Sequence, residues 1–380
     1  MIWERVKLGD VSDSCLGKML DQRKNKGTYK PYLANVNVRW GAFDLDNLQE
    51  MKFEDDEDER YGIKYGDLII CEGGEPGRCA IWKEQLPNMK IQKALHRLRV
   101  NEEMDYRYVY YWFLLAGKQG ALKQYYTGAT IMHMPGQKLK EVVIDKPPLD
   151  VQRKIGDYLE AFDDLIENNQ KQIKLLEEAA QRLYKEWFVD LRFPGYEDVD
   201  VVDGVPDGWS KEPIGSIIGK VSRTKQIKTA DYLLEGAIPV IDQSRNFIAG
   251  YTNDSEALVN TGTPVIVFGD HTRILKYIQF PFAKGADGTQ LIISDRTNMP
   301  QSLLYLSLIA VDLSNYHYAR HFKYLKAEYI LIPTQDVADE FDRLISPIFS
   351  QIQKLREKCY KLSQARDRLL QKLMSGEIEV

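Results

Sequence analysis

The strongest constraint on the fold is an internal repeat that spans nearly the whole chain of 380 residues. Residues 139–151 (LKEVVIDKPPLDV) resemble residues 325–337 (LKAEYILIPTQDV) at an offset of 186, and this register continues without a gap to about residues 190 and 376. Near the two starts, residues 3–11 resemble residues 209–217 at an offset of 206. The chain therefore reads as one unit written twice, with each copy a globular region followed by a tail.

Both tails show the heptad spacing of a coiled-coil seam. In the first tail the seam residues are Ile155, Phe162, Asn169, Leu176 and Leu183, with Leu159, Ile166, Ile173, Ala180 and Trp187. In the second tail they are Phe341, Ile348, Leu355, Leu362 and Leu369, with Ile345, Ile352, Cys359, Arg366 and Leu373. Because apolar rows avoid water, we expect two long helices that pack on each other. Asn169 either fixes the register of this seam or is a half-exposed residue.

Breaks at proline and glycine divide the chain into five parts. These are a globular region over residues 1–147, a helix over 148–190, a linker over 191–208, a globular region over 209–333 and a helix over 334–380. A proline and then an aspartate precede each helix, so we expect Asp150 and Asp336 to be N-caps. Apolar runs at residues 67–72, 264–268 and 291–294 predict strands, whereas residues 106–115 and 303–313 predict buried helices. The expected fold class is α+β, with two similar mixed domains that are each followed by a long helix.

Composition and motifs exclude several classes of protein. The chain has 44% hydrophobic and 28% charged residues, which is typical of globular domains. It has no apolar run long enough to span a membrane, and MIWERVKLGD lacks the order of a signal peptide, so we expect a soluble cytoplasmic protein. The four cysteines form no CxxC pair, which favours reduced thiols.

Catalytic and metal-binding motifs are scarce. The segment from Gly215 to Val221 has the wrong glycine spacing for a phosphate loop and lacks its Ser or Thr. His317 and His321 have the spacing of helical metal ligands, but no HExxH glutamate lies between them. We find no G-x-S-x-G elbow and no methyltransferase or nuclease motif. We therefore expect no catalytic residue, no metal site and no cofactor bound by this chain.

Basic and aromatic residues gather at comparable places in both copies. Cationic side chains position proteins on phosphates, and Arg, His and Thr can also read base edges. The candidates for DNA contact are Arg23, Lys24, Lys26, Arg39, Lys93, Arg97, Tyr125, Tyr126 and Thr130 in the first copy, and Lys220, Arg223, Lys225, Lys228, His271, Arg273, Arg320, His321 and Lys323 in the second. For any one cluster, a solvated face with salt bridges remains the alternative.

Taken together, these features resemble the specificity subunit of type I restriction-modification systems, over the whole chain. The resemblance is carried by the Trp-x-x-x-x-Leu/Ile-Gly openings at Trp3 and Trp209, by KPPLDVQRKIGDYLEAFDDLIENN from Lys146, by LYKEWFVDLRFPG and VPDGW between Leu183 and Trp209, and by LLQKLMSGEI from Leu369. The family usually has Glu-Gln near each helix start. Here Val151-Gln152 and Val337-Ala338 stand at those positions.

The resemblance implies two target-recognition domains that each read one half of a split DNA site. It implies that the two long helices pack as an antiparallel coiled coil, related by a pseudo-twofold axis, and act as a spacer. It also implies docking of two modification (methyltransferase) subunits, to which restriction subunits can be added. S-adenosylmethionine, ATP and Mg would then belong to those partners. No motif of the family fixes the residues that contact bases.

Two interpretations remain open: a DNA-recognition subunit, and a coiled-coil adaptor that binds proteins without reading DNA. Duplication of the basic clusters together with the helices favours the first, because an adaptor needs only the helices. The net charge of −5 predicts that the chain alone binds DNA weakly and with a shallow salt dependence. We expect affinity to rise when partner subunits close around the duplex.

Overall fold

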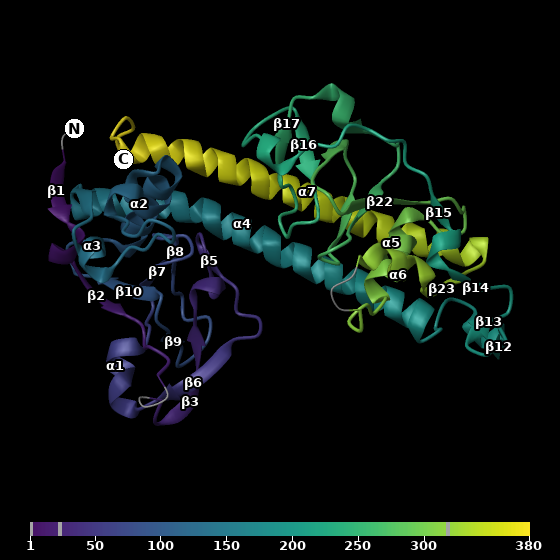
Figure 1. Ribbon diagram of the computed structural model, residues 1–380, viewed down its shortest axis with the longest axis horizontal. Helices are drawn as coiled ribbons and strands as arrows, with labels where there is room; N and C mark the ends of the chain where they lie inside the picture. The colour runs from purple at the N-terminus through teal and green to yellow at the C-terminus, as the bar shows by residue number, and fades with distance from the viewer. Residues whose placement is uncertain (1–2, 22–24, 317–319) are drawn as a thin grey trace. The chain divides into compact units, whose positions relative to one another are not determined.

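The computed structural model describes residues 3–21, 25–316 and 320–380 (Figure 1). The predicted candidates Arg23 and Lys24, and His317 of the metal-like pair, lie outside the described residues. The chain divides into two compact units, Met1–Glu167 with Cys359–Val380, and Asn168–Lys358. Each unit holds one β-rich domain together with segments of both long helices, α4 (Leu149–Tyr184) and α7 (Gln335–Met374). The predicted α+β class and the two long helices are confirmed.

The first domain combines four small sheets with short helices. Its elements are β1 (Glu4–Lys7), β2 (Ser12–Leu16), β3 (Thr28–Leu33), β4 (Val38–Arg39), β5 (Ala42–Phe43), β6 (Gln49–Phe53), α1 (Asp58–Tyr61), β7 (Leu68–Cys71), β8 (Cys79–Ile81), β9 (Lys90–Ile91), β10 (Leu95–Val100), α2 (Tyr106–Gln119), α3 (Gly136–Lys140) and β11 (Val143–Lys146). The main sheet has the antiparallel order β2-β10-β7-β8. A second sheet has the order β6-β3-β9, in which β3 and β9 are parallel.

The second domain repeats the order of the main sheet and of three strands of the second sheet, to which it adds β18 (Leu258–Val259). Its elements are β12 (Val201–Val202), β13 (Val205–Pro206), β14 (Ser210–Pro213), β15 (Ile218–Gly219), β16 (Ile238–Ile241), β17 (Gly250–Thr252), β18 (Leu258–Val259), β19 (Val265–Gly269), β20 (Leu275–Ile278), β21 (Phe282–Lys284), β22 (Thr289–Ser294), α5 (Gln301–Ala310), α6 (His321–Ala327) and β23 (Tyr329–Ile332). The main sheet has the order β15-β22-β19-β20, and the second has β17-β16-β21-β18 with β16 and β21 parallel. The repeat seen in the sequence is therefore a repeat of strand order.

In each domain an entering strand, β1 or β14, pairs with the strand that precedes the long helix. Glu4 lies opposite Lys146 in the antiparallel pair β1–β11, and Ser210 lies opposite Ile332 in β14–β23. Two residues separate that closing strand from the start of the long helix. Each domain is therefore closed by its own entering and leaving strands.

The predicted seam residues pack into the core of their own unit. In the first unit Ile155 and Leu159 are buried with Leu370, Leu373 and Met374 of α7. In the second unit Ile345 and Ile352 are buried, and Leu176 packs against them as a half-buried residue. Ile166, Asn169 and Leu362 are half-buried, and a register role for Asn169 stays a prediction.

Three local predictions need correction. The helices α4 and α7 begin at Leu149 and Gln335, so Asp150 and Asp336 lie in the first turn instead of capping it. The carbonyls of Pro148 and Thr334 accept the first intrahelical hydrogen bonds, and the aspartates still face the positive end of the helix dipole. The helix predicted over residues 303–313 ends at Ala310, because the Asp312 carboxylate accepts a hydrogen bond from the Ser314 amide and favours a turn. The segment expected to be a surface linker contains the paired strands β12 and β13 and the buried Phe193.

The cysteines and the helices add two further observations. All four cysteines are described, and none forms a disulfide. Among the described residues, no helix is long and apolar enough to cross a membrane.

Candidate nucleic-acid interface

Three loops of the first domain meet at the end of β7. The Glu72 amide donates a hydrogen bond to the Ala94 carbonyl at 2.9 Å, and the Glu72 carbonyl accepts one from the Met134 amide at 2.8 Å. Glu72 follows β7, Ala94 precedes β10 and Met134 precedes α3. We call the loops 72–78, 92–94 and 126–134 the first loop junction.

The second domain builds the same junction from equivalent positions. The Asp270 amide donates to the Gly288 carbonyl at 2.7 Å, and the Asp270 carbonyl accepts from the His321 amide at 2.9 Å. Ala94 and Gly288 both have left-handed backbone conformations, with φ of 87° and 80°. We call the loops 270–274, 286–288 and 314–321 the second loop junction, of which residues 317–319 are outside the described residues.

A buried histidine supports each junction from inside. Nε2 of His96 lies 3.0 Å from the Met134 carbonyl oxygen. Burial lowers the pKa of His96, which favours the neutral ring at neutral pH. In the second junction the two ring nitrogens of His321 lie 2.9 Å from the carbonyl oxygens of Asp270 and Tyr316. These rings hold the buried ends of the loops, while the loop tips stay exposed.

A cation from the adjacent hairpin fixes a further loop in each domain. Nη2 of Arg78 donates to the Asn35 carbonyl at 3.0 Å, just after β3. Nζ of Lys276 donates to the carbonyls of Asp242 and Asn246, at 2.8 Å and 2.5 Å, just after β16. Burial lowers the pKa of Lys276 to about 8. The two copies thus hold the same loop by cations of different chemistry.

Gln243 joins this loop to the second loop junction. Its Nε2 donates to the Asp287 carbonyl at 2.7 Å, and its Oε1 accepts from the His271 amide at 3.1 Å. The Thr272 hydroxyl donates to the Gln243 carbonyl at 2.7 Å. One amide residue therefore sets the relative positions of three exposed loops.

Most of the predicted contact residues are exposed or half-buried in the described structure. These are Lys26, Arg39, Lys93, Thr130, Lys220, Arg223, Lys225, Lys228, His271, Arg273, Arg320 and Lys323. Lys93 and Thr130 belong to the first loop junction, whereas His271, Arg273 and Arg320 belong to the second. Lys225 is paired with Asp254 at 2.6 Å, and Arg39 with Asp44 at 3.5 Å.

Four predicted residues have internal partners instead of exposed tips. Arg97 is only 4% exposed, and its guanidinium contacts the Asp13 carboxylate at 2.7 Å. His321 is buried as described above. The Tyr126 hydroxyl donates to the Pro76 carbonyl at 2.5 Å, and the Tyr125 hydroxyl accepts from the Val143 amide at 3.2 Å. We assign these four side chains to support of the fold and the loops.

The sequence-based prediction missed an apolar tip in the first loop junction. Thr127 and His133 exchange two backbone hydrogen bonds, of 2.8 Å and 2.9 Å, and the loop between them exposes Ile131 (64%) and Met132 (47%). Gly128 has φ of +100°, and a Cβ there would lie 2.2 Å from the Ile131 carbonyl oxygen. The turn therefore requires glycine. An apolar pair inside a Thr- and Gly-rich loop was the available signal.

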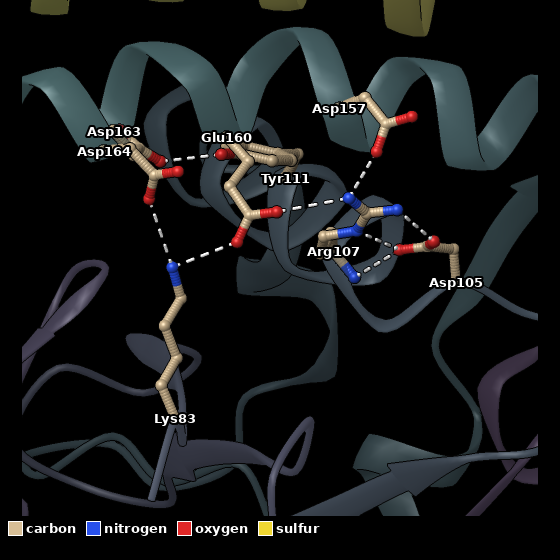
Figure 2. Close-up of polar contacts among 8 residues, drawn as sticks. All are labelled: Lys83, Asp105, Arg107, Tyr111, Asp157, Glu160, Asp163 and Asp164. Carbon is tan, nitrogen blue, oxygen red and sulfur yellow. Dashed lines mark hydrogen bonds and ion pairs between the residues drawn. The ribbon is translucent and has the colours of Figure 1, made fainter. Parts of the chain in front are cut away.

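Charged contacts fasten the first domain to α4 (Figure 2). The Arg107 guanidinium contacts Asp105 in its own domain, and Asp157 and Glu160 on the helix, at 2.5 Å to 3.1 Å. Lys83 reaches Glu160 at 3.0 Å. Figure 2 also shows Lys83 with Asp164, and the Tyr111 hydroxyl with Asp163. These contacts raise the pKa of Arg107, chiefly through its hydrogen bond to Asp105.

The long helices contact each other through polar groups as well as the seam. In the first unit the Arg366 guanidinium pairs with Asp163, and the Cys359 thiol lies 3.8 Å from the Ile166 carbonyl. In the second unit Arg356 pairs with Glu177 at 2.6 Å. In each unit an earlier segment of one helix therefore meets a later segment of the other, which makes the pair antiparallel.

Comparison with known proteins identifies the family. The model of the type I restriction modification DNA specificity domain matches residues 2–178. The type I restriction enzyme MjaIX specificity subunit of Methanocaldococcus jannaschii is 29% identical over 343 residues, which cover 83% of this chain and 78% of that protein. The MjaVIII specificity subunit of the same organism is 24% identical over 241 residues, covering 62% and 53%.

A solved structure shares the fold. The crystal structure of the type I restriction-modification system S subunit from M. genitalium aligns with a TM-score of 0.55 at 15% identity, and covers 98% of this chain and 96% of that chain. Such low identity supports the fold alone. The family model and the curated relatives identify this chain as a member of the family of type I restriction-modification specificity subunits.

Proposed function

We propose that this chain recognises a split DNA target, with each loop junction reading one half of it. The observation that carries this proposal is the duplicated junction, because both domains hold equivalent loops on buried supports and expose cationic or polar side chains there, beside the apolar Ile131 and Met132 in the first. Exposed Lys and Arg suit phosphates, and Thr130 and His271 suit base edges. Family membership gives the chain a recognition role and leaves catalysis to its partners.

We further propose that α4 and α7 act as the spacer between the two half-sites. The helices have 36 and 40 residues, or about 54 and 60 Å at the α-helical rise. Insertion of one helical turn, about four residues, into both helices should lengthen the tolerated gap between half-sites. An unchanged gap would refute the spacer role and leave the recognition role standing.

The proposed partners are two modification subunits, which would supply S-adenosylmethionine chemistry, and restriction subunits that use ATP and Mg. These would be cytoplasmic assemblies. Because the net charge of this chain is −5, we expect its own DNA binding to be weak and its salt dependence shallow. Tight and steeply salt-dependent binding by the isolated chain would contradict this division of labour.

Methylome sequencing tests the recognition role. The chain is co-expressed with its modification subunit, and the methylated motif is compared with that of a chain whose residues 1–147 come from a relative with another specificity. We expect only one half of the motif to change. If both halves stay unchanged, or if no split motif is methylated, the chain does not read DNA and the coiled-coil adaptor becomes the better interpretation.

Point variants localise the reading to the junctions. We expect Lys93→Ala with Thr130→Ala to weaken or relax methylation at one half-site, and His271→Ala with Arg320→Ala at the other, with each replaced base contact costing about 1 to 3 kcal/mol. Arg182→Ala, an exposed change on α4, is the matched control and should leave the motif intact. Equal effects of all three variants would refute this placement.

A further inference from the structure

A groove of about 830 Å³ opens in the first unit beside the start of α4. Its apolar lining includes Trp3, Pro147, Ile155, Leu373 and Val380. Ile155 and Leu373 are buried at its base, whereas Trp3 is half-buried. All lining residues belong to the first unit, so the groove is a feature of that unit by itself.

The repeat shows what fills the equivalent place in the second unit. There Trp209 stands for Trp3 and Phe341 for Ile155, at the two offsets of the repeat. The ring of Phe193 packs on Trp209 with 4.8 Å between centroids, and Phe188 lies 5.5 Å from Trp209 and 4.9 Å from Phe341. Trp209 is therefore covered, with 9% of its surface exposed. In this unit the place is occupied by aromatic rings from the segment that follows α4.

The first unit lacks those rings. At the same offset, Met374 stands for Phe188 and Glu379 stands for Phe193. Glu379 is exposed and lines the groove instead of filling it. One unit therefore supplies its own aromatic filling at this place, while the other leaves a groove with an apolar base.

The rim of the groove is acidic. Glu4, Glu102, Glu103 and Glu379 line it, and Lys146 is the one cation among the described lining residues. Lys146 is paired with Glu103. An acidic rim repels phosphate and attracts a basic ligand, so the groove does not suit a DNA backbone.

We propose that this groove binds an extended segment of a partner protein that presents an aromatic ring with a basic residue beside it. The filled copy supplies the pattern, because Phe193 follows Arg192 there and its ring covers the tryptophan. The ring enters between Trp3 and the apolar base, and the neighbouring cation lies against the glutamate rim. This site is independent of DNA reading and adds a protein-binding role to the domain.

The probe is a fluorescein-labelled peptide LRFPGY, copied from residues 191–196, titrated into the full chain and followed by fluorescence anisotropy. We expect saturable binding with Kd on the order of 100 µM, weakened by salt. The peptide LRAPGY should bind at least about tenfold more weakly, because the ring is the buried anchor. Glu102→Arg should also weaken binding through loss of the acidic rim.

Filling the groove gives the decisive variant. Glu379→Phe restores the ring of the other copy, and it should reduce LRFPGY binding at least about tenfold, because the anchor place becomes occupied. Glu377→Phe adds the same ring on the neighbouring exposed residue, which does not line the groove, and should leave binding unchanged. Thermal unfolding followed by circular dichroism confirms that both variants are folded.

Three results with the peptides and the Phe variants would overturn the proposal, and a fourth concerns DNA. These are no saturable binding of LRFPGY, equal binding of LRAPGY, and equal effects of Glu379→Phe and Glu377→Phe. Competition by a DNA duplex for the peptide would also overturn it, because the groove would then contact nucleic acid. None of these readouts depends on methylation, so the proposal can fail while DNA recognition stands.

Discussion

The main sheets of the two domains have the same strand order, but the two domains are held together by different residues. In the first domain the buried Gln152 of α4 accepts from the Asp105 amide at 2.9 Å, and donates to the Pro147 carbonyl at 2.8 Å. In the second domain Ala338 stands at that position, and Asn298 reaches the Pro333 carbonyl at 2.8 Å from the loop before α5. The carbonyl before the long helix is thus bonded by a side chain of the helix in one domain, and by a side chain of the facing loop in the other. The shared strand order determines which buried backbone groups need a hydrogen-bond partner. It does not determine which side chain provides that partner.

The loops show the same freedom. An arginine in one copy and a lysine in the other hold the loop that follows the parallel strand, and an alanine and a glycine share one left-handed position. Residues that touch the sheet are replaced by residues of similar role. The exposed tips carry different residues, Lys93 and Thr130 in one junction and His271 and Arg320 in the other, as two independent DNA half-sites would require.

Removal of Gln152 should give the largest effect on stability. Gln152→Ala leaves the Asp105 amide and the Pro147 carbonyl buried without partners, and we expect a loss of about 3 kcal/mol in the free energy of unfolding. Urea denaturation measures this. The matched control is Gln335→Ala at the start of the other helix, where the side chain is exposed and the expected loss is below about 0.5 kcal/mol. Equal losses would mean that the two helix starts are fastened alike.

Lys276 should make the stability of the second domain depend on pH. Its pKa in the folded chain is about 8, below the ordinary 10.5, so the unfolded state binds more protons between these values. The stability contribution is therefore present at high pH and is lost as the pH falls through 8. Relative to Lys276→Met, the wild-type chain should gain about 2 kcal/mol between pH 7 and pH 10. A difference that is constant over this range would show that Lys276 stays charged in its buried place.

The smallest expected effect concerns Ala94. This residue has φ of 87°, where its counterpart is Gly288, and the left-handed region strains a Cβ by about 1 to 2 kcal/mol. Ala94→Gly relieves that strain but adds backbone freedom to the unfolded chain, so we expect a net gain of about 0.5 kcal/mol. Ala129→Gly, on an exposed loop without positive φ, should lose a similar amount. Thermal unfolding distinguishes a gain from a loss.

The sequence predicted the architecture because the repeat and the heptads are local or strictly periodic signals. Offsets of 206 and 186 place Glu4 on Ser210 and Lys146 on Ile332, which are the paired ends of equivalent strands. By contrast, the burial of Arg97 depends on Asp13, its partner 84 residues earlier in the chain. The neighbouring residues in the sequence do not distinguish a buried cation on a strand from an exposed one.

The supports of the loop junctions were missed for a related reason. Gln243 and Lys276 donate hydrogen bonds to backbone carbonyls. Because every residue type has a backbone carbonyl, the sequence does not indicate which one is the acceptor. The groove of the first unit was also found only from the structure, because it is recognised by comparison with the filled place in the second unit. Once the fold is known, however, the change from Phe193 to Glu379 becomes visible in the aligned copies.

The strand pairs that close each domain, β1 with β11 and β14 with β23, have a consequence for inheritance. When the entering and leaving strands of a domain are hydrogen-bonded to each other, the backbone enters and leaves that domain at one place. Genetic recombination between crossover points in these strands would exchange the intervening segment as a cassette, and the frame that receives it would keep its own backbone pairing. New target specificities could then arise by reassortment of existing segments, without the gradual mutation of a reading surface that must stay functional at every step.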